Sequence, residues 1–505
     1  MEHLDVLIVG AGISGIGAAH HLNRHCPDRS YALFEARERI GGTWDLFRYP
    51  GIRSDSDMFT LGYNFKPWTE AKAIADGPSI LRYLDETVAE DGTASKIRLQ
   101  HKVTGAAWDS ATSRWTVDYI SGPEATPGRL TCSFLFLCAG YYRYDTGHRP
   151  QFPGEAAFTG KIVHPQFWPQ DLDYTGQNVV VIGSGATAMT LVPAMAATAG
   201  SVTMLQRSPT WVVSRPAEDA VANWLRRTLP AKLAYGVIRW RNVLMQMYFY
   251  WLTRVAPDKV KERLLELAAA ELPKDYDLAT HFKPRYNPWD QRLCLVPDAD
   301  LFQAIRSGDA EVVTDTIDTF TPDGIRLSSG RELKADIIVT ATGLELQSLG
   351  GIPMTVDGAP LDVSQTFSYR GLMYTGVPNL ASVFGYTNAS WTLKADLSAE
   401  FVCRVLNRMR ATGTTEARPR PPGPDVDAAP WLDFSSGYVV RALDRFPRQA
   451  RSGPWQVHQN YVKDIMAMRF ASLDDGILEF RKAGAAGASS QRPDADQPVP
   501  TASAA

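Results

Sequence analysis

Two glycine-rich turns in the sequence have the residue spacing that binds dinucleotides. The first turn, Gly10-Ala11-Gly12-Ile13-Ser14-Gly15, follows the apolar run at residues 4–9 and precedes a stretch of helical character at residues 16–22. In a GxGxxG turn the first glycine permits a tight bend and the second lets a pyrophosphate approach the backbone, while the third packs the helix against the strand. The amino end of the helix then offers N–H groups to phosphates. The turn therefore predicts a nucleotide site.

An acidic residue after the next expected strand indicates which nucleotide this site prefers. Residues 31–34 form a second apolar run that ends at Glu35, and a carboxylate there can hydrogen-bond an unphosphorylated ribose. The location near the N-terminus, followed by Gly41-Gly42-Thr43-Trp44, favours FAD over NAD. The expected contacts with FAD are Gly10, Gly12, Ser14, Gly15, Glu35, Gly42, Thr43, Trp44, Asp55 and Val103.

The second turn, Gly183-Ser184-Gly185-Ala186-Thr187-Ala188, differs in the residues that follow its next strand. The apolar run at 201–205 ends in Gln206-Arg207-Ser208, with no carboxylate. An arginine can bind a 2′-phosphate that an acid would repel, and a serine can donate a hydrogen bond to it. This pattern predicts an NADPH site. The expected contacts with NADPH are Gly183, Ser184, Gly185, Thr187, Arg207 and Ser208.

The bulk composition agrees with a soluble α/β protein that has two such nucleotide folds. Hydrophobic residues make up 45% and charged residues 21% of 505 residues, and the net charge of −3 gives no basic footprint for nucleic acid. The five cysteines form no CxxC pair and no zinc-type cluster, so we expect neither a metal site nor a disulfide framework. With no signal peptide and no long apolar run, a cytoplasmic protein is the default expectation.

The two turns and the composition suggest a division of the chain into domains. We expect two Rossmann-like dinucleotide-binding domains with a helical insertion and a disordered tail. The expected FAD-binding domain is discontinuous, at residues 1–145 and 345–485. The expected NADPH-binding domain covers 150–217 and 273–343, the helical insertion 218–272, and the tail, rich in Ala, Ser and Pro, 486–505.

A short motif before the second turn narrows the chemistry. A disulfide reductase would need a redox cysteine pair, which the sequence lacks. The segment 158–169 instead carries Phe158, Gly160, His164, Trp168 and Pro169, and so fits the pattern FxGxxxHxxxWP at every fixed position. In this motif, and in segments 41–55, 286–294 and 385–393, the chain resembles the class I Baeyer–Villiger flavoprotein monooxygenases.

The resemblance implies a reaction and roles for several residues. Family members use NADPH to reduce FAD, add O2 to give a C4a-peroxide, and convert ketones to esters or lactones. Arg292 falls at the position of the family's active-site arginine, and Asp55 at that of its acidic partner. His164 and Trp168 belong to a linker motif that responds to NADP. Many members have a lysine before the arginine, where this chain has Gln291, so NADPH preference is expected to depend more on Arg207.

Several alternatives stay open on the sequence alone. A related flavin enzyme could oxygenate sulfur or nitrogen, so sulfides stand beside ketones as expected substrates. A flavin- and NADPH-binding redox sensor without turnover is the alternative outside enzymes. The aromatic run at 235–252 either packs into the core, which is the commoner explanation, or roofs the substrate tunnel, or makes peripheral membrane contact. The oligomeric state is not predicted.

Overall fold

The first glycine turn lies between a buried strand and a helix, as the sequence predicts. The computed structural model describes residues 1–483, so the predicted disordered tail at 486–505 lies outside the described residues. Strand β1 (His3–Val9) leads into helix α1 (Ile13–His25) and then strand β2 (Tyr31–Phe34). Residues 6–9 of β1 are buried, because parallel strands on both sides and α1 above cover it.

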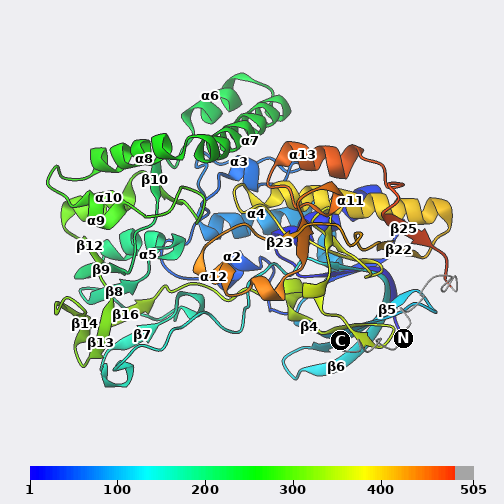
Figure 1. Ribbon diagram of the computed structural model, residues 1–505, viewed down its shortest axis with the longest axis horizontal. Coiled ribbons are helices and arrows are strands. Elements are labelled where there is room, and N and C mark those ends of the chain that lie inside the picture. Colours follow the sequence, from blue (N-terminus) through cyan, green and yellow to red (C-terminus); the bar gives the residue numbers. More distant parts are fainter. Residues whose placement is uncertain (484–505) are drawn as a thin grey trace, which may run out of the picture.

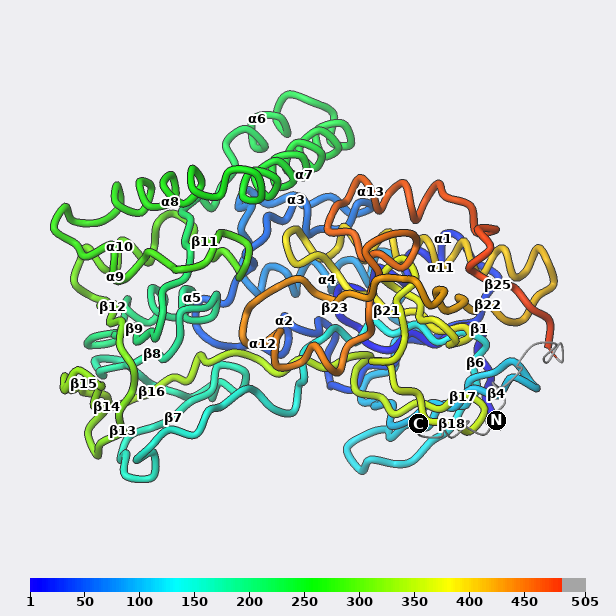
Figure 2. Tube along the Cα trace, in the orientation of Figure 1, coloured from blue at the N-terminus to red at the C-terminus, as the bar shows by residue number. Residues whose placement is uncertain are grey.

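The first sheet combines this parallel unit with an antiparallel layer. Its order is β18-β17-β4-β5-β6-β1-β2-β3, with β21 also paired to β6. The long strands β4 (His101–Asp109), β5 (Arg114–Ser121) and β6 (Thr126–Leu137) form an antiparallel meander. The remaining strands are β3 (Ile97–Arg98), β17 (Met354–Val356), β18 (Ala359–Pro360) and β21 (Leu380–Ser382). Helix α11 (Trp391–Thr412) packs beside α1 (Figure 2).

The second glycine turn belongs to a separate, wholly parallel sheet. Its order is β12-β9-β8-β16-β7, and the turn joins β8 (Asn178–Ile182) to helix α5 (Ala186–Ala196). The other strands are β7 (Lys161–Val163), β9 (Ser201–Gln206), β12 (Ala310–Thr314) and β16 (Ile337–Thr340). A small antiparallel sheet, β13 (Ile317–Thr321), β14 (Gly324–Leu327) and β15 (Glu332–Lys334), packs on it. The α/β fold with two nucleotide-binding sheets is confirmed.

The chain crosses between the two sheets twice, and the crossings are joined to each other. The first crossing follows β6 and the second follows β16, and both can be traced in Figure 2. The N–H of Arg143 donates to the carbonyl of Glu345 at 2.9 Å, and that of Gln347 donates to Tyr141 at 2.9 Å. These backbone bonds fix the edge at which the two sheets face one another.

Three helices occupy most of the segment predicted as a helical insertion. They are α6 (Ala220–Thr228), α7 (Ala231–Val255) and α8 (Pro257–Glu271), and they lie along the upper edge in Figure 1. One face of α7 is buried, including Tyr235, Ile238 and Val243, whereas the opposite face is exposed. The expectation of core packing for residues 235–252 therefore holds for one face only. No helix among residues 1–483 has the length and apolar character needed to cross a membrane.

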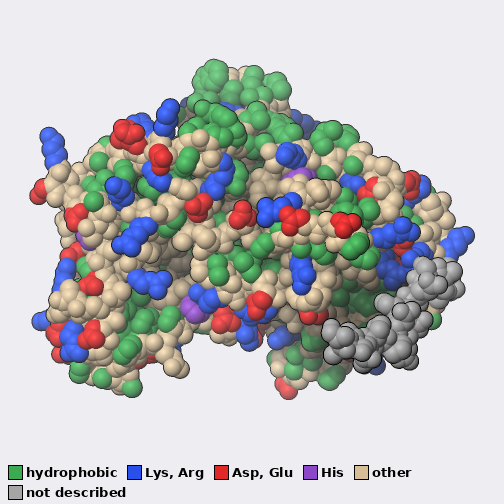
Figure 3. Space-filling view, in the orientation of Figure 1, with side chains coloured by type: hydrophobic (Ala, Val, Ile, Leu, Met, Phe, Trp, Pro, Cys, Tyr) green, Lys and Arg blue, Asp and Glu red, His purple; other side chains and the backbone are tan. Residues whose placement is uncertain are grey.

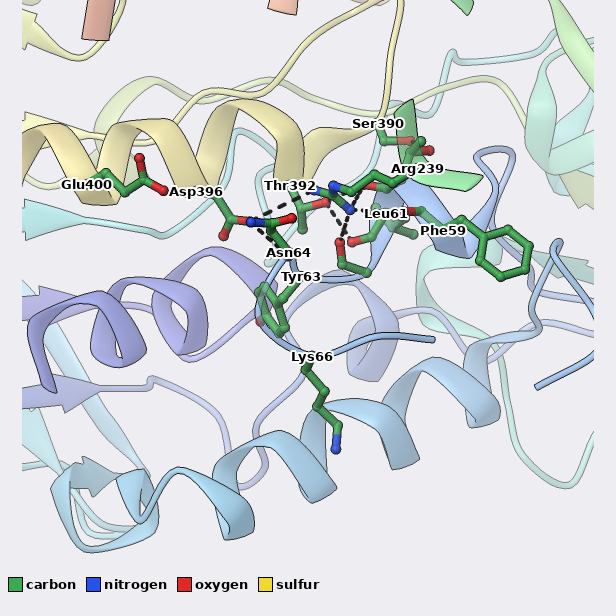
Figure 4. Close-up of polar contacts among 12 residues, drawn as sticks. Phe59, Leu61, Tyr63, Asn64, Lys66, Arg239, Ser390, Thr392, Asp396 and Glu400 are labelled. Carbon is green, nitrogen blue, oxygen red and sulfur yellow. Dashed lines mark hydrogen bonds and ion pairs between the residues drawn. The ribbon is translucent and has the colours of Figure 1, made fainter. Parts of the chain in front are cut away.

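A buried arginine joins α7 by hydrogen bonds to the part of the molecule that contains the first sheet. Arg239, only 4% exposed, donates from Nη1 to the carbonyls of Phe59 (2.9 Å) and Gly62 (2.7 Å) (Figure 4). Thr392, at the start of α11, donates to the carbonyls of residues 60 and 61 in the same segment, which is a short helix at 58–61. Nη2 of Arg239 lies 4.0 Å from Oδ2 of the buried Asp396, so an opposite charge offsets part of the cost of burying the guanidinium, and the network fixes the position of α7.

Shorter elements connect these layers. The remaining helices are α2 (Thr43–Leu46), α3 (Met58–Leu61), α4 (Gly77–Glu90), α9 (Leu278–Phe282), α10 (Asp300–Ser307), α12 (Gly437–Val440) and α13 (Tyr461–Ile465), which continues as η8 (Met466–Phe470). The remaining short strands are β10 (Val212–Arg215), β11 (Cys294–Pro297), β19 (Ser368–Tyr369), β20 (Met373–Tyr374), β22 (Glu416–Pro419), β23 (Ala428–Pro430), β24 (Arg448–Ala450) and β25 (Leu478–Arg481).

Candidate active site

One large cleft contains both glycine turns and the predicted arginine–aspartate pair. The cleft has a volume of about 1240 Å³ and is lined from both sheets. Of the expected site residues it is lined by Gly10, Gly12, Ser14, Glu35, Gly42, Thr43, Trp44, Asp55, Val103, Gly183, Ser184, Gly185, Thr187, Arg207, Ser208 and Arg292. Gly15 and the five fingerprint residues do not line it.

The backbone of the first turn leaves no space for side chains at two of its glycines. Gly10 has φ +104°, and a Cβ there would lie 2.6 Å from the carbonyl oxygen of Cys138. A Cβ at Gly15 would lie 1.8 Å from the carbonyl oxygen of Gly10, because α1 begins directly on the strand end. Gly15 therefore serves helix packing, which explains its absence from the cleft lining.

A second backbone segment closes over the first turn. The N–H of Gly41 donates to the carbonyl of Ala11 at 3.0 Å, and a Cβ at Gly42 would lie 3.1 Å from Cα of Gly12. Two backbone segments without side chains, at Gly12 and Gly42, thus face one another where they line the cleft. Such a cradle, which a Cβ would fill, fits an elongated dinucleotide.

Glu35 stands at the end of β2, where the sequence places the ribose-binding acid. Its two carboxylate oxygens accept from the N–H groups of Ala11 (2.9 Å) and Arg37 (3.0 Å). The side chain is 5% exposed, and burial raises the pKa of the carboxyl. Glu35 therefore holds the glycine turn in place as well as facing the cleft.

The second turn is more open than the first. Gly183 has φ +139°, and a Cβ there would strike the carbonyl of Ala341, whereas a Cβ at Gly185 would meet nothing within 4 Å. Ser184 Oγ donates to the carbonyl of Ser208 at 3.0 Å, which ties the turn to the residues after β9. Arg207 is exposed at the cleft wall and forms no ion pair within residues 1–483. The turn and the arginine together fit a phosphate-bearing ligand.

Arg292 and Asp55 meet in the cleft, although they are far apart in the chain. Arg292 donates to Oδ2 of Asp55 from both Nε (2.9 Å) and Nη2 (2.6 Å). The side chains are 34% and 31% exposed, so the pair faces the cleft and is not sealed in the core. The negative charge of Asp55 is the main cause that raises the pKa of Arg292 well above its usual value. The arginine is therefore a permanent cation.

Tyrosines around this pair were missed by the sequence reasoning. Tyr141 and Tyr142 follow β6, their hydroxyls are 3.0 Å apart, and both line the cleft together with Tyr438. Burial raises the pKa of Tyr142 to about 12, so its hydroxyl stays protonated. Their position directly after a buried strand that ends in Gly140 is a signal that could have identified them, because the carboxyl ends of parallel strands gather at the ligand-binding edge.

Two aromatic side chains form a stacked wall of the same cleft. Trp391 donates from its indole nitrogen to Oγ of Ser14 at 2.8 Å, and its ring stacks on Tyr141 with centroids 5.2 Å apart. The amino end of α11 thus joins the first glycine turn to the residues beside Arg292.

The fingerprint segment supports the crossing between the sheets from outside the cleft. Gln166 donates from its side-chain amide to the carbonyls of Arg143 (2.9 Å) and Tyr144 (3.0 Å). A Cβ at Gly147 would lie 2.1 Å from the ring of His164, so this ring fills the space beside the first crossing. Phe158 and Trp168 pack at the margins of two hydrophobic clusters, and a Cβ at Gly160 would meet the carbonyl of Asp336. The motif therefore packs against the first crossing and lies outside the lining of the cleft.

Comparison with protein families and curated proteins places the chain. Residues 8–73 match the NAD(P)-binding Rossmann-like domain, and residues 80–344 match the flavin-binding monooxygenase-like family. FAD-containing monooxygenase EthA of Mycobacterium tuberculosis is 56% identical over 482 residues, which cover 95% of this chain and 98% of that protein. The EthA of Mycolicibacterium smegmatis is 53% identical over 486 residues, with 96% and 98% covered.

Solved structures share the fold. An oxidized steroid monooxygenase bound to NADP is 25% identical, with a TM-score of 0.69 over 83% of this chain and 88% of that one. A cyclohexanone monooxygenase with bound ε-caprolactone has a TM-score of 0.69 at 20% identity, with 83% and 90% covered, which shows the fold alone. On its family match and its near full-length identity to the EthA proteins, this chain belongs to the flavin-binding monooxygenase-like family, among the FAD-containing monooxygenases.

Proposed function

We propose that this monooxygenase uses FAD and NADPH to insert one oxygen atom from O2 beside a carbonyl, giving an ester or lactone. The observation that carries the proposal is the Arg292–Asp55 pair in a cleft lined by two different nucleotide turns. When bound, the flavin supplies the activation of O2 and the nicotinamide supplies the hydride. The protein then needs to bind, orient and stabilise charge.

The first turn and the Gly41–Thr43 segment would hold FAD. Gly12 and Gly42 leave the backbone bare where a pyrophosphate would lie, and the amino end of α1 points N–H groups toward it. Glu35 would accept from a ribose hydroxyl, while its bonds to Ala11 and Arg37 keep it in place. Trp44 and Val103 line the same part of the cleft.

The second turn would hold NADPH. Gly185 leaves space at the amino end of α5, and Arg207 and Ser208 follow β9 where a 2′-phosphate would lie. Gln291 lines the cleft but offers no charge, so the phosphate preference is assigned to Arg207.

Arg292 would stabilise the negative charge that develops on the carbonyl oxygen of the substrate. A fixed cation is effective because no group has to reorient during the reaction. Asp55 orients the guanidinium through two hydrogen bonds to one oxygen. The hydroxyls of Tyr141 and Tyr142 stay protonated, so these side chains add no charge beside Arg292.

The proposed domain boundaries follow the two sheets. Every strand of the nine-stranded sheet lies within 1–145 or 345–485, and every strand of the five-stranded sheet lies within 150–217 or 273–343. The helices of 218–272 form the proposed insertion. We also propose peripheral membrane contact through 235–252, because the outer face of α7 is apolar and exposed.

A conversion assay tests the proposed function. The FAD-loaded protein would be incubated with NADPH and, separately, phenylacetone, a linear methyl ketone and a thioether. Ester formation in step with NADPH consumption is the expected result. Sulfoxide without any ester would favour a heteroatom oxygenase, because oxygen transfer to sulfur creates no carbonyl oxyanion for Arg292 to stabilise. NADPH consumption with hydrogen peroxide as the sole product would contradict both oxygenase assignments.

A further inference from the structure

The outer face of α7 is a continuous apolar stripe. Its exposed side chains recur every three or four residues, which is the spacing of one helix face. They are Leu233 (55% exposed), Val237 (42%), Trp240 (45%), Leu244 (53%), Tyr248 (62%), Trp251 (54%) and Val255 (54%). In Figure 3 hydrophobic side chains form the top of the molecule over α6 and α7, where Trp224 adds a further 60% exposed indole.

A second segment, near residue 460 and remote from α7 in the sequence, extends this stripe. The ring of Trp240 contacts that of Tyr461 at the start of α13, with centroids 5.8 Å apart. Val462, Met466 and Phe470 follow at intervals of four residues and are 40%, 58% and 69% exposed. An exposed apolar surface of this extent, made by two remote segments, marks an interaction site.

The charges near the stripe indicate the kind of partner. Residues 220–255 contain six basic and no acidic residues, of which Arg239 is buried and two others pair with Asp219 and Asp290. Arg227 and Lys232 are exposed and form no ion pair within the described part of the chain. A second copy would present the same cations in a twofold contact, so like charges would face each other. Tryptophan and tyrosine flanked by basic residues instead suit the headgroup region of an anionic bilayer.

A groove beside α7 adjoins the cleft. Its volume is about 710 Å³, and α7 lines it with Met247, Tyr250 and Trp251. Tyr386 and Ala389 line both this groove and the main cleft. Trp289 and Asn388, the latter 9% exposed, also line the groove.

We propose that α6, α7 and the α13–η8 segment lie on an anionic lipid surface, and that the groove beneath α7 admits a lipid-soluble substrate from it to Arg292. This inference rests on the proposed oxygenase function for the identity of the substrate as an apolar ketone. Arg239 and its bonds to residues 59–62, at the end of α3, hold α7 in place, so the surface and the groove keep a fixed relation to the cleft.

Vesicle sedimentation tests the lipid contact without any turnover. The full-length FAD-loaded protein would be mixed with vesicles of phosphatidylcholine containing one third phosphatidylglycerol, and with phosphatidylcholine alone. Binding to the anionic vesicles is expected. The variant W224S/L244S/Y248S should lower the partition coefficient at least about tenfold. Arg227→Glu with Lys232→Glu should lower it by about tenfold on anionic vesicles only. Leu99→Ser, which changes an exposed leucine elsewhere, should have no effect.

The same samples separate the alternatives. Absence of sedimentation with anionic vesicles overturns the lipid contact. A dimer in solution that the triple variant converts to monomer would assign the surface to a second copy and also overturn it. Circular dichroism of each variant shows whether the fold is intact, and a misfolded triple variant leaves the charge reversal on exposed residues as the deciding comparison.

A substitution that narrows the groove at a position outside the cleft tests the proposed route of the substrate. Ala429, on β23, lines the groove but not the cleft, so Ala429→Trp should obstruct the passage while vesicle binding stays unchanged. Oxidation of a long-chain methyl ketone dissolved in the vesicles should fall about tenfold, and that of butanone much less. Equal rates for the variant and for Ala429→Ser on the long ketone would overturn the route. Failure of every ketone in every protein would contradict the proposed function instead, and leave the sedimentation result to decide the lipid contact.

Discussion

Arg292 places both its Nε and its Nη2 on a single oxygen of Asp55, at 2.9 and 2.6 Å, across 237 residues of sequence. Asp55 comes from the loop before α3, and Arg292 from the segment before β11. The pair therefore forms only when the two sheets face one another across the cleft. Its geometry directs the plane of the guanidinium while leaving the cation accessible, as a charge-stabilising group requires.

Removing the guanidinium should separate the two halves of the reaction. In Arg292→Ala, reduction of the flavin by NADPH should continue, because the second glycine turn is untouched. Ester formation should fall about a hundredfold or more, as for loss of one preorganised charge-stabilising group. Stopped-flow absorbance of the flavin gives the first rate, and product analysis gives the second. A variant that still forms ester at the parent rate would remove Arg292 from the mechanism.

The pH dependence of the oxygenation should distinguish arginine from lysine at this position. Asp55 raises the pKa of Arg292 well above its usual value, so the folded protein keeps this proton as pH rises. No alkaline loss of activity from Arg292 is expected below about pH 10. Arg292→Lys has a usual side-chain pKa of about 10.4, so its activity should decline as pH approaches that value. Matching alkaline limbs in the two proteins would contradict the assignment.

Arg207 should determine the choice between NADPH and NADH. Loss of a charge-assisted contact with the 2′-phosphate costs about 1.5–3 kcal/mol, so KM for NADPH should rise about tenfold to a hundredfold in Arg207→Ala. KM for NADH should hardly change, because that cofactor has no 2′-phosphate. Arg215→Ala, an exposed arginine at the end of β10, is the matched control. Equal rises for both cofactors would mean that Arg207 does not contact this phosphate.

Gly15→Ala should release FAD by distorting the turn. The new Cβ would lie 1.8 Å from the carbonyl oxygen of Gly10, so α1 must move away from the strand end. We expect most of the flavin absorbance to be lost after gel filtration. Gly236→Ala on α7 meets nothing within 4 Å and should retain FAD, with a gain in stability of about 0.5–1 kcal/mol from the helical preference of alanine. Full FAD retention in Gly15→Ala would contradict the predicted role of this turn.

The elements and residues of the nucleotide sites follow from local sequence signals. Strand, glycine turn and helix are contiguous, so residues 4–35 and 178–208 predict the units that β1-α1-β2 and β8-α5-β9 form. The Arg292–Asp55 contact depends on the meeting of two sheets, and no local pattern contains it; only the family resemblance indicated it. The groove under α7 arises in the same way from distant segments, whereas Tyr141 and Tyr142 follow β6 directly and carry a local signal.

Which face of α7 is exposed is a second feature that the sequence alone does not predict. Large apolar residues of α7 lie on all sides of the helix, so its composition favours burial. The periodicity of these residues alone does not show which face another element covers. The structure shows that Arg239 and Tyr235 point inward, with hydrogen bonds to carbonyls in segment 59–63, while Trp240 and Leu244 point outward. A buried arginine on the inner face was not expected from the sequence.

The mass of the product formed under oxygen-18 tests the central claim most directly. The FAD-loaded protein would be supplied with NADPH, labelled O2 and phenylacetone, and the ester would be analysed by mass spectrometry. We predict benzyl acetate that carries one labelled oxygen atom, in step with NADPH consumption. Benzyl acetate without label, or NADPH consumption that yields only labelled hydrogen peroxide, would contradict the claim that this cleft inserts oxygen beside a carbonyl.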